Sequence, residues 1–404
     1  MAGSTSAASV QRATVFVLLA AAVSCARGPA PPAGSDGELS ATIAEVEAGR
    51  RTTPIIMRAT ETSESAVTFL VKEPGGQTPR IVSDATGWGS SEDAPYDTRT
   101  GTMTPVGTTG WYRLDARVAP GARVEYLVVH GESDYRVDPN NPRRAWSPSG
   151  YEVSELVTPD FEPPRELLDP PAEPRGTTIE ATMASRALGG TRRVLVYLPA
   201  GYHDGGAYPV AVLHAGWRAA HEGQAPRVLD WLIAHREVPP IVVMFLESYV
   251  QGDASNHEGP PLRAFLTREA PGWLASRYSV SARSGDWAVI AISYGAKDAL
   301  DAALAPDRGY GRVGLLIPGR RLTPADLETF ALERHRRLRV AVLAGRYDAL
   351  NLPAARDTAR VLGAAGHDVD YLEVPEGHNP TTWRNHLSDV FVSLFGQREV
   401  PGAH

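Results

Sequence analysis

A serine, an aspartate and a histidine in the C-terminal half of the chain each follow directly after an apolar run. The serine, Ser293, lies in "WAVIAISYGAKDAL" (287–300), where a helical pattern begins just beyond it. This context fits G-x-S-x-G, the strand-to-helix turn that exposes a nucleophile, with Ala291 replacing the first glycine. The letters alone are not specific, because "AGSDG" (33–37) fits them without a strand. The alternative is a polar residue that merely ends a buried strand.

A serine hydroxyl is a weak nucleophile near neutral pH, so it needs a base and an acid that orients the base. Asp348 follows the apolar run of "RVAVLAGRYDALN", and His378 follows the last such run in "YLEVPEGHNPTTW". The order Ser, Asp, His, each after its own strand, is typical of α/β-hydrolases. Plainer roles stay open, since Asp348 could cap the next helix and His378 could be an exposed loop histidine.

An oxyanion formed at an ester carbonyl needs N–H donors close to the serine. The sequence predicts the backbone N–H of Tyr294 as one donor. The second is expected from the loop after "PVAVLHAG", at Gly216 or Trp217, and the sequence does not choose between them. No metal, P-loop or dinucleotide motif occurs in a strand-to-helix context, so neither a metal nor a cofactor is expected.

The elements that must position these residues alternate along the second half of the chain. Runs rich in Val, Ile and Leu predict strands at 193–200, 208–216, 240–248, 286–293, 311–319, 337–345 and 368–377. Helical patterns lie between them, for example at 223–235 and 262–278. Such alternation predicts an α/β fold with a mostly parallel sheet covered on both faces. Sites in such sheets form at the carboxyl ends of the strands.

The first half has a different pattern. Apolar and polar residues alternate in short runs separated by turn clusters, which predicts a small antiparallel β-sandwich over 54–157. A Pro-rich linker at 158–177 precedes the α/β domain, expected at 178–398. Trp88, Trp111 and Tyr112 either stack on a sugar ligand or pack within the sandwich and against the second domain.

The N-terminus carries the features of an export signal. Arg12 precedes the apolar run Ala13–Ser24, which is too short to span a bilayer and leads directly into Cys25. "AAVSC" resembles a bacterial lipobox, so residues 1–24 are expected to be a signal peptide, Cys25 to be acylated, and 25–53 to be a flexible tether. The chain would then be an exported, membrane-anchored lipoprotein, periplasmic or on the cell surface. An ordinary secretory signal is the alternative.

Composition narrows the class of protein. The 404 residues carry a net charge of −7, which argues against electrostatic binding of nucleic acid. Cys25 is the only cysteine, so disulfides and thiolate metal sites are excluded.

Both halves carry a resemblance to one family. "RRVLVYLPAGY" (192–202), "FLTREAPGWLASRYSV" (265–280) and the stretch 341–387 resemble the esterase family of α/β-hydrolases, and within it the enterochelin-esterase-like group. "VTFLVKEPGG", "VSDATGWG" and "RVEYLVV" resemble the early-set, immunoglobulin-like module that precedes those enzymes. The resemblance implies Ser293 as nucleophile, Asp348 as acid and His378 as base.

The chain departs from the family pattern around the pocket. The aspartate of the family's "HDG" is Ala215 here, and the elbow "GxSxGG" has become "AISYGA". Of the family's Arg-Glu motif, only Glu258 remains. His214, Glu258 and Trp383 are the candidates for substrate contacts.

These patterns predict a serine carboxylic-ester hydrolase acting on a small-molecule ester. An acyltransferase of the same fold would differ only in the acyl acceptor. A non-catalytic lipoprotein that binds a glucan or a siderophore-like ligand is the other alternative, favoured by the changes at Ala215 and Ala291.

Overall fold

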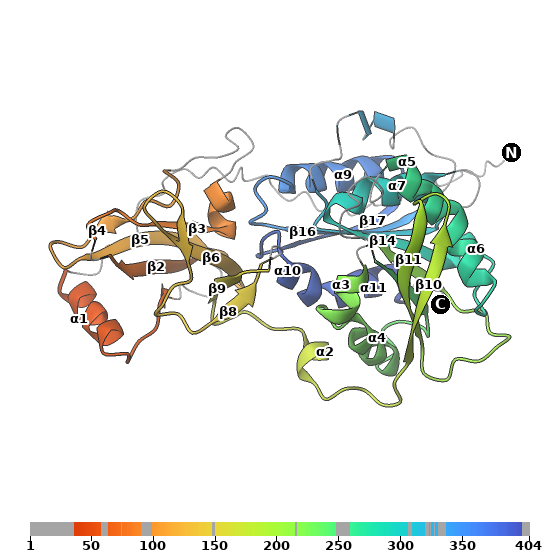
Figure 1. Cartoon of the computed structure of the whole chain (residues 1–404), viewed down its shortest axis with the longest axis horizontal. Coiled ribbons are helices and arrows are strands. Elements are labelled where there is room, and N and C mark those ends of the chain that lie inside the picture. The colour runs from red at the N-terminus through yellow and green to blue at the C-terminus, as the bar shows by residue number, and fades with distance from the viewer. Residues whose placement is uncertain are drawn as a thin grey trace, which may run out of the picture.

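A computed structural model describes residues 36–57, 64–73, 75–89, 99–147, 150–214, 216–247, 259–305, 309–319, 323, 325–326, 328–329 and 337–397. The signal segment, Cys25, Ala215 and Glu258 lie outside the described residues. The described chain forms a small β-sandwich beside a larger α/β domain (Figure 1). The predicted fold class is therefore confirmed.

The sandwich consists of two antiparallel sheets, as the alternating sequence pattern requires. One sheet has the strand order β1 (Ile55–Met57), β2 (Ser65–Lys72), β5 (Trp111–Val118), β4 (Thr104–Pro105). The other has the order β3 (Arg80–Ser83), β6 (Arg123–His130), β9 (Glu152–Val157), β8 (Arg144–Trp146), with β7 (Asp134–Arg136) paired to β6. Alternate residues such as Val67, Phe69, Tyr126 and Val128 point inward and form the core between the sheets.

A helix, α1 (Asp36–Glu47), covers one sheet of the sandwich. The prediction of a flexible tether up to residue 53 is therefore wrong over this helix. Ile43 and Val46 lie at helical spacing and pack on Leu70 and Trp111, which gives the segment a buried face. Trp111 is buried, and its indole N–H donates to Glu47 at 3.0 Å, so the sugar-stacking alternative is wrong for Trp111. Tyr112 packs against the sandwich core.

The second domain is built on an eight-stranded sheet. Its order is β10 (Thr177–Ser185), β11 (Gly190–Leu198), β13 (Val242–Leu246), β12 (Val210–His214), β14 (Trp287–Ile292), β15 (Arg312–Leu316), β16 (Arg339–Gly345), β17 (Asp368–Val374). Strands β12 to β17 run parallel, and β10 and β11 are antiparallel additions at one edge. The carboxyl ends of β14, β15, β16 and β17 therefore meet along one end of the sheet.

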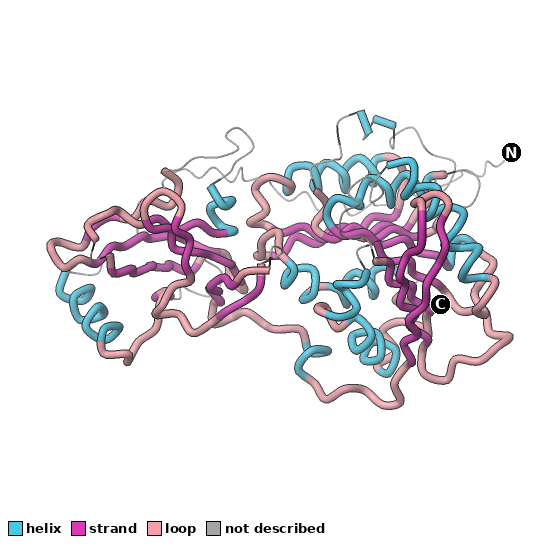
Figure 2. Tube along the Cα trace, in the orientation of Figure 1, coloured by secondary structure: helices cyan, strands magenta, loops and turns pink. Residues whose placement is uncertain are grey.

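Helices cover both faces of this sheet, as the apolar strands require (Figure 2). One face packs against α5 (Gly259–Ala264), the π-helical turn η2 (Phe265–Glu269), α6 (Ala270–Ala275), α7 (Ala296–Leu304) and α9 (Leu352–Ala364). The other packs against α3 (Gly216–His221), α4 (Ala225–Ala234), α10 (Pro380–Asn385) and α11 (Leu387–Phe395). Among the described residues, no helix has the length and apolar character needed to cross a bilayer.

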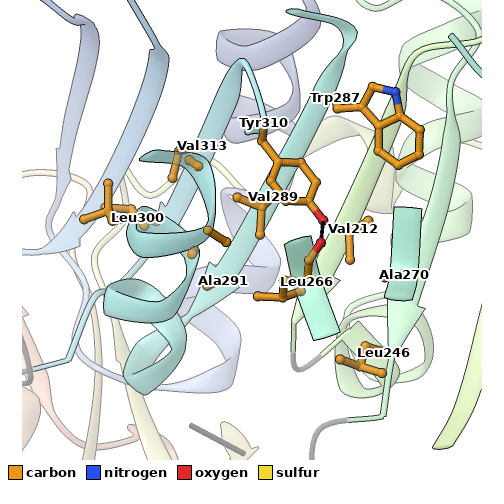
Figure 3. Close-up of a cluster of buried hydrophobic side chains, with 14 of the residues drawn as sticks. Val212, Leu246, Leu266, Ala270, Trp287, Val289, Ala291, Leu300, Tyr310 and Val313 are labelled. Atoms are coloured by element: carbon orange, nitrogen blue, oxygen red, sulfur yellow. Dashed lines mark hydrogen bonds between the residues drawn. The ribbon is translucent and has the colours of Figure 1, made fainter. Parts of the chain in front are cut away.

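Strand β14 lies in the middle of the core (Figure 3). Val289 and Ala291 are fully buried between β12 and β15, and Leu300 of α7 packs over the same face. Tyr310 is anchored beside them, because its hydroxyl donates to the carbonyl of Leu266 at 2.6 Å. The strand that ends at Ser293 is thus a rigid support.

The connector between the domains contains a short helix, α2 (Arg165–Leu168), and is tied to α4. Arg227 donates to the carbonyls of Glu166 and Asp169, at 3.1 and 2.6 Å, and Trp231 donates to the Asp169 carboxylate at 3.0 Å. These contacts fix the path of the chain between the two domains.

Candidate active site

A sharp turn presents Ser293 at the carboxyl end of β14. Ser293 has φ = +54°, a left-handed conformation that is strained for a residue with a Cβ atom. It opens the 3₁₀ turn η4 (Ser293–Gly295), which runs directly into α7. A Cβ atom at Gly295 would lie 3.0 Å from His214 Cε1 and 3.2 Å from Ala291 Cβ, so the turn leaves room only for glycine. This close approach of strand and helix is the geometry expected of a nucleophile elbow.

The structure brings Ser293, His378 and Asp348 together. Ser293 Oγ lies 2.9 Å from His378 Nε2, and His378 Nδ1 lies 2.6 Å from Asp348 Oδ2. With Asp348 as a carboxylate, Nδ1 carries the proton and donates it, which leaves Nε2 to accept the hydrogen bond of the serine hydroxyl. Asp348 is buried, whereas the imidazole is 30% exposed. The imidazole of His378 can therefore take the proton of the serine hydroxyl while the Asp348 carboxylate stays out of water.

Each member of this set lies on a loop after a different parallel strand. Asp348 comes three residues after β16 ends at Gly345, and His378 comes four residues after β17 ends at Val374. The N-cap residue of α9 is Asn351, and Asp348 Oδ1 accepts the backbone N–H of Asn351 at 3.3 Å, so the carboxylate contacts the start of α9 as well as His378. Asn351 Nδ2 donates to Asp348 Oδ1 at 2.7 Å, so the two carboxylate oxygens have separate partners.

A cavity of about 480 Å³ opens at the serine, and both domains line it. The α/β domain contributes Ser293, His378 and the apolar surface of Tyr347 and Leu350. The rest of the described lining is Asp84, Gly87, Trp88, Tyr294, Gly319, Asp348, Ala349 and Asn351. The site therefore lies between the domains, and the sandwich forms part of its wall.

The other predicted site residues have different environments. Tyr294 follows Ser293 in the turn, and its side chain is largely exposed at the cavity. Gly216 and Trp217 are the first residues of α3, just beyond the end of β12, and helix-first N–H groups have no partner inside the helix. His214 is buried beneath the elbow against Gly295. The structure does not bring His214 to the described lining of the cavity.

Trp383 is also away from the cavity. It is a residue of α10 whose side chain is buried in the core, where a Cβ atom at Gly223 would lie 2.5 Å from its ring. The Glu258 and Cys25 predictions lie outside the described residues. Within the part of the chain that the structure describes, no group of His, Cys, Asp or Glu residues is arranged to hold a metal ion.

The sequence did not predict that Asp84 and Asn351 lie at the site. Trp88 was predicted only to stack on a sugar or to pack, not to line the cavity beside Ser293. Asn351 could have been found as an amide three residues beyond Asp348. The sandwich residues carry no comparable signal, because the turn "SDATGWG" reads as an ordinary loop. Burial raises the pKa of Asp84 to about 6, and the nearby Asp348 carboxylate adds to that increase, while hydrogen bonds from Glu125 and Trp88 oppose it.

An eight-stranded, mostly parallel sheet with a serine at the elbow after β14 and an aspartate and a histidine after later strands defines an α/β-hydrolase. Residues 185–393, more than half of the chain, match the family described as "Putative esterase". The chain belongs to this family and is an esterase, a carboxylic-ester hydrolase. No curated protein matches its sequence.

Solved structures of similar fold include both domains. The chain is similar to the ferric enterobactin esterase of Salmonella typhimurium, with 21% identity, 85% of this chain and 96% of that chain covered, and a TM-score of 0.66. It is similar to the enterobactin esterase of Shigella flexneri, solved in the presence of enterobactin, with 19% identity, 90% and 99% coverage, and a TM-score of 0.65. The predicted likeness to enterochelin esterases is confirmed at the level of the fold.

Proposed function

We propose that the protein hydrolyses a small-molecule carboxylic ester through an acyl-enzyme on Ser293. The observation that carries this proposal is the continuous hydrogen-bonded chain from Ser293 Oγ through the His378 imidazole to the Asp348 carboxylate. The adjoining cavity gives the ester a place to bind beside the hydroxyl.

In the first half of the reaction, Ser293 Oγ attacks the ester carbonyl carbon and its proton passes to His378 Nε2. The imidazolium is stabilised by Asp348, which keeps the ring in the orientation that receives the proton. The tetrahedral intermediate then collapses, the bond to the alcohol breaks, and His378 returns the proton to the leaving alcohol oxygen. The acyl group stays on Ser293 as an ester.

In the second half, water takes the place of the alcohol. His378 accepts a proton from that water as its oxygen attacks the acyl carbon, and the same proton later returns to Ser293 Oγ. The products are the free carboxylic acid and the restored hydroxyl. In both halves the oxyanion is assigned to the N–H of Tyr294 together with that of Gly216 or Trp217.

The natural ester is proposed to be an enterobactin-like or other small ester. Its support is the fold shared with an enterobactin esterase solved in the presence of enterobactin. The first test uses a soluble form that begins after Cys25 and compares p-nitrophenyl acetate, p-nitrophenyl butyrate and enterobactin as substrates.

The decisive variant is Ser293→Ala, with Ser393→Ala as the matched control. Ser393 lies on α11 and donates to Asp370 at 2.6 Å, remote from the cavity lining. The Ser293→Ala variant should lose at least about 10³-fold in kcat, since the nucleophile acts as a unit with its base. The Ser393→Ala variant should retain the parental kcat. Equal activity in the parent and the Ser293→Ala variant would contradict the proposal.

We also propose that the chain is exported and anchored by an acylated Cys25. The support is Arg12, the apolar run Ala13–Ser24 and the small residues before Cys25. In bacterial cells, the Cys25→Ala variant of the full chain should move from the detergent-soluble membrane fraction to the soluble fraction. An unchanged distribution would refute the anchor without affecting the esterase chemistry.

A further inference from the structure

The loop that carries His378 packs directly against the sandwich domain. A Cβ atom at Gly377 would lie 2.6 Å from Asp84 Cβ and closer still to the Asp84 carboxyl group. Pro375, two residues earlier, accepts a hydrogen bond at its carbonyl from the backbone N–H of Arg123 at 3.2 Å. The backbone on the N-terminal side of the histidine thus lies on residues of another domain.

Asn379, directly after His378, is held from both domains. Its Nδ2 donates to Asp84 Oδ2 at 3.0 Å, while its Oδ1 accepts from Arg123 Nη1 at 3.3 Å and from the N–H of Thr382 at 3.0 Å. The bond from Thr382 makes Asn379 the N-cap of α10. The donor and acceptor ends of the amide therefore have different partners, which fixes the orientation of this side chain.

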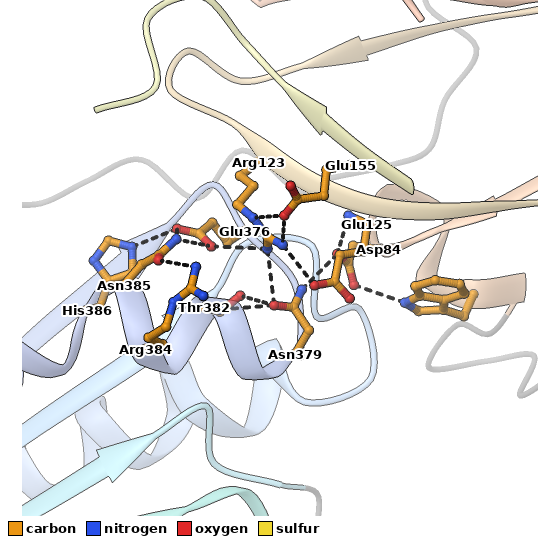
Figure 4. Close-up of polar contacts among 11 residues, drawn as sticks. Asp84, Arg123, Glu125, Glu155, Glu376, Asn379, Thr382, Arg384, Asn385 and His386 are labelled. Carbon is orange, nitrogen blue, oxygen red and sulfur yellow. Dashed lines mark hydrogen bonds and ion pairs between the residues drawn. The ribbon is translucent and has the colours of Figure 1, made fainter. Parts of the chain in front are cut away.

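The Asp84 carboxylate accepts hydrogen bonds from three separate segments of the chain (Figure 4). Besides Asn379, its carboxylate accepts from the N–H of Glu125 at 2.8 Å and from the indole N–H of Trp88 at 2.9 Å. Asp84 is 1% exposed, so water does not substitute for these partners. Arg123 stands on the other side of Asn379 and pairs with Glu125, Glu155 and Glu376.

The loop of Asp348 is tied to the sandwich as well. The backbone N–H of Ala119 donates to the hydroxyl of Tyr347 at 2.7 Å, and the N–H of Tyr347 donates to the carbonyl of Glu376 at 3.0 Å. A Cβ atom at Gly87 would lie 3.1 Å from Ala349 Cβ. The loop of Asp348 and the loop of His378 are therefore bound to each other and to residues at the ends of sandwich strands.

We propose that Asp84 of the sandwich domain is a positioning residue for the reaction, which holds the loop of His378 through Asn379 and Gly377 at the distance that Ser293 requires. This inference rests on the proposed function of the Ser293 site and deepens it. The hydrogen bonds that Asp84 accepts come from Trp88, Glu125 and Asn379 and not from Ser293 or the His378 ring, so Asp84 acts through the residues on either side of the histidine. The sandwich is in this sense a part of the hydrolytic machinery.

The test is the Asp84→Asn variant in the soluble form of the chain. An asparagine cannot accept hydrogen bonds with both ends of its amide, so either the Trp88 indole or the Glu125 and Asn379 donors lose their partner. The expected result is a fall in kcat of about 10- to 100-fold with p-nitrophenyl acetate, as for other residues that orient a reacting group. KM should stay within about threefold of the parent, since the binding surface is retained.

A fluorophosphonate probe supplies the readout that distinguishes positioning from folding. Loss of folded protein lowers the fraction of chains that the probe finally labels, whereas a displaced His378 lowers the rate of labelling of every folded chain. The Asp84→Asn variant should label slowly and to completion. Slow turnover that came entirely from a reduced labelled fraction would overturn the proposal.

Asp138→Asn is the matched control. Asp138 is equally buried in the same sandwich and accepts from Thr53, Tyr126 and Asn140, all within the sandwich. It should label at the parental rate. If both variants slowed labelling equally, the effect would belong to the sandwich in general and not to Asp84.

If Asp84→Asn does not fold, Asn379→Ser tests the same contact between the two domains. In Asn379→Ser, the serine can still cap α10 but is too short to reach Asp84, so the bond between the domains is lost while the cap remains. It should reproduce the loss in labelling rate. Parental rates in the Asp84 and Asn379 variants, beside an inactive Ser293→Ala variant, would overturn the positioning role and leave the proposed function intact. Activity in Ser293→Ala would instead remove the proposed function itself.

Discussion

The substitution Gly377→Ala adds one methyl group at the point where the His378 loop meets the sandwich. The new Cβ atom would lie 2.6 Å from Asp84 Cβ, whereas ordinary contacts of this kind begin near 3.4 Å. The loop and Asp84 must therefore separate by at least 0.8 Å, the difference between these two distances. Neither side can yield without breaking the hydrogen bonds of Asp84 to Glu125 and Asn379.

Two consequences follow from this displacement. Overpacking of a buried contact costs about 1–3 kcal/mol of the free energy of unfolding. A shift of about 1 Å in a reacting group can lower the rate by about 10²-fold, so kcat should fall by about 10- to 100-fold. The assays are urea unfolding and p-nitrophenyl acetate hydrolysis, both at the same pH.

Gly363→Ala is the control for the same chemical change. Gly363 lies in α9, where an added Cβ atom meets nothing within 4 Å. Alanine is favoured over glycine inside a helix by about 1 kcal/mol, so this variant should be as stable as the parent or more stable, with unchanged kcat. Parental stability and parental kcat in the Gly377→Ala variant would refute the contact between the loop and Asp84.

Two further predictions concern Gly295, in the turn after Ser293, and the charge of His386. Gly295→Ala should lower kcat by more than about tenfold, because the methyl group meets His214 and Ala291 and pushes α7 away from the strand; parental activity would contradict the packed elbow. Burial opposes the imidazolium of His386, but hydrogen bonds to Asp389 and Glu376 outweigh it and raise its pKa to about 9. The stability from His386 should be complete below about pH 6.5 and lost as the pH rises through 9, a difference of about 3 kcal/mol that urea unfolding measures. In the His386→Gln variant, the free energy of unfolding should no longer fall between pH 6.5 and 9. An equal pH dependence of this free energy in variant and parent would contradict the role of His386.

The sequence was sufficient for the features that depend on local pattern. Strands β12 to β16 were predictable because buried parallel strands are continuous apolar runs. Ser293, Asp348 and His378 were predictable because each follows a predicted strand, and parallel strands bring their carboxyl ends together. Helix α1 was not predicted, since its apolar face depends on Leu70 and Trp111, which are distant along the chain.

The sequence also did not predict that the sandwich contributes residues to the site. Asp84 and Asn379 are separated by 295 positions, and their residue types alone do not predict that they form a hydrogen bond with each other. His214 and Trp383 were placed near the substrate by their neighbours in the sequence, but the register of β12 and the packing of α10 turn both into the core. Such outcomes depend on how elements dock, which local pattern does not specify.

Trapping the acyl-enzyme would show directly whether Ser293 is the nucleophile. The soluble form of the chain is mixed with p-nitrophenyl acetate, quenched in acid within the first turnovers, digested and analysed by mass spectrometry. If Ser293 is the nucleophile, the peptide that contains it should carry an acetyl group, and the same peptide of the Ser293→Ala variant should carry none. Acetylation confined to another residue, or turnover in the Ser293→Ala variant, would contradict this role of Ser293.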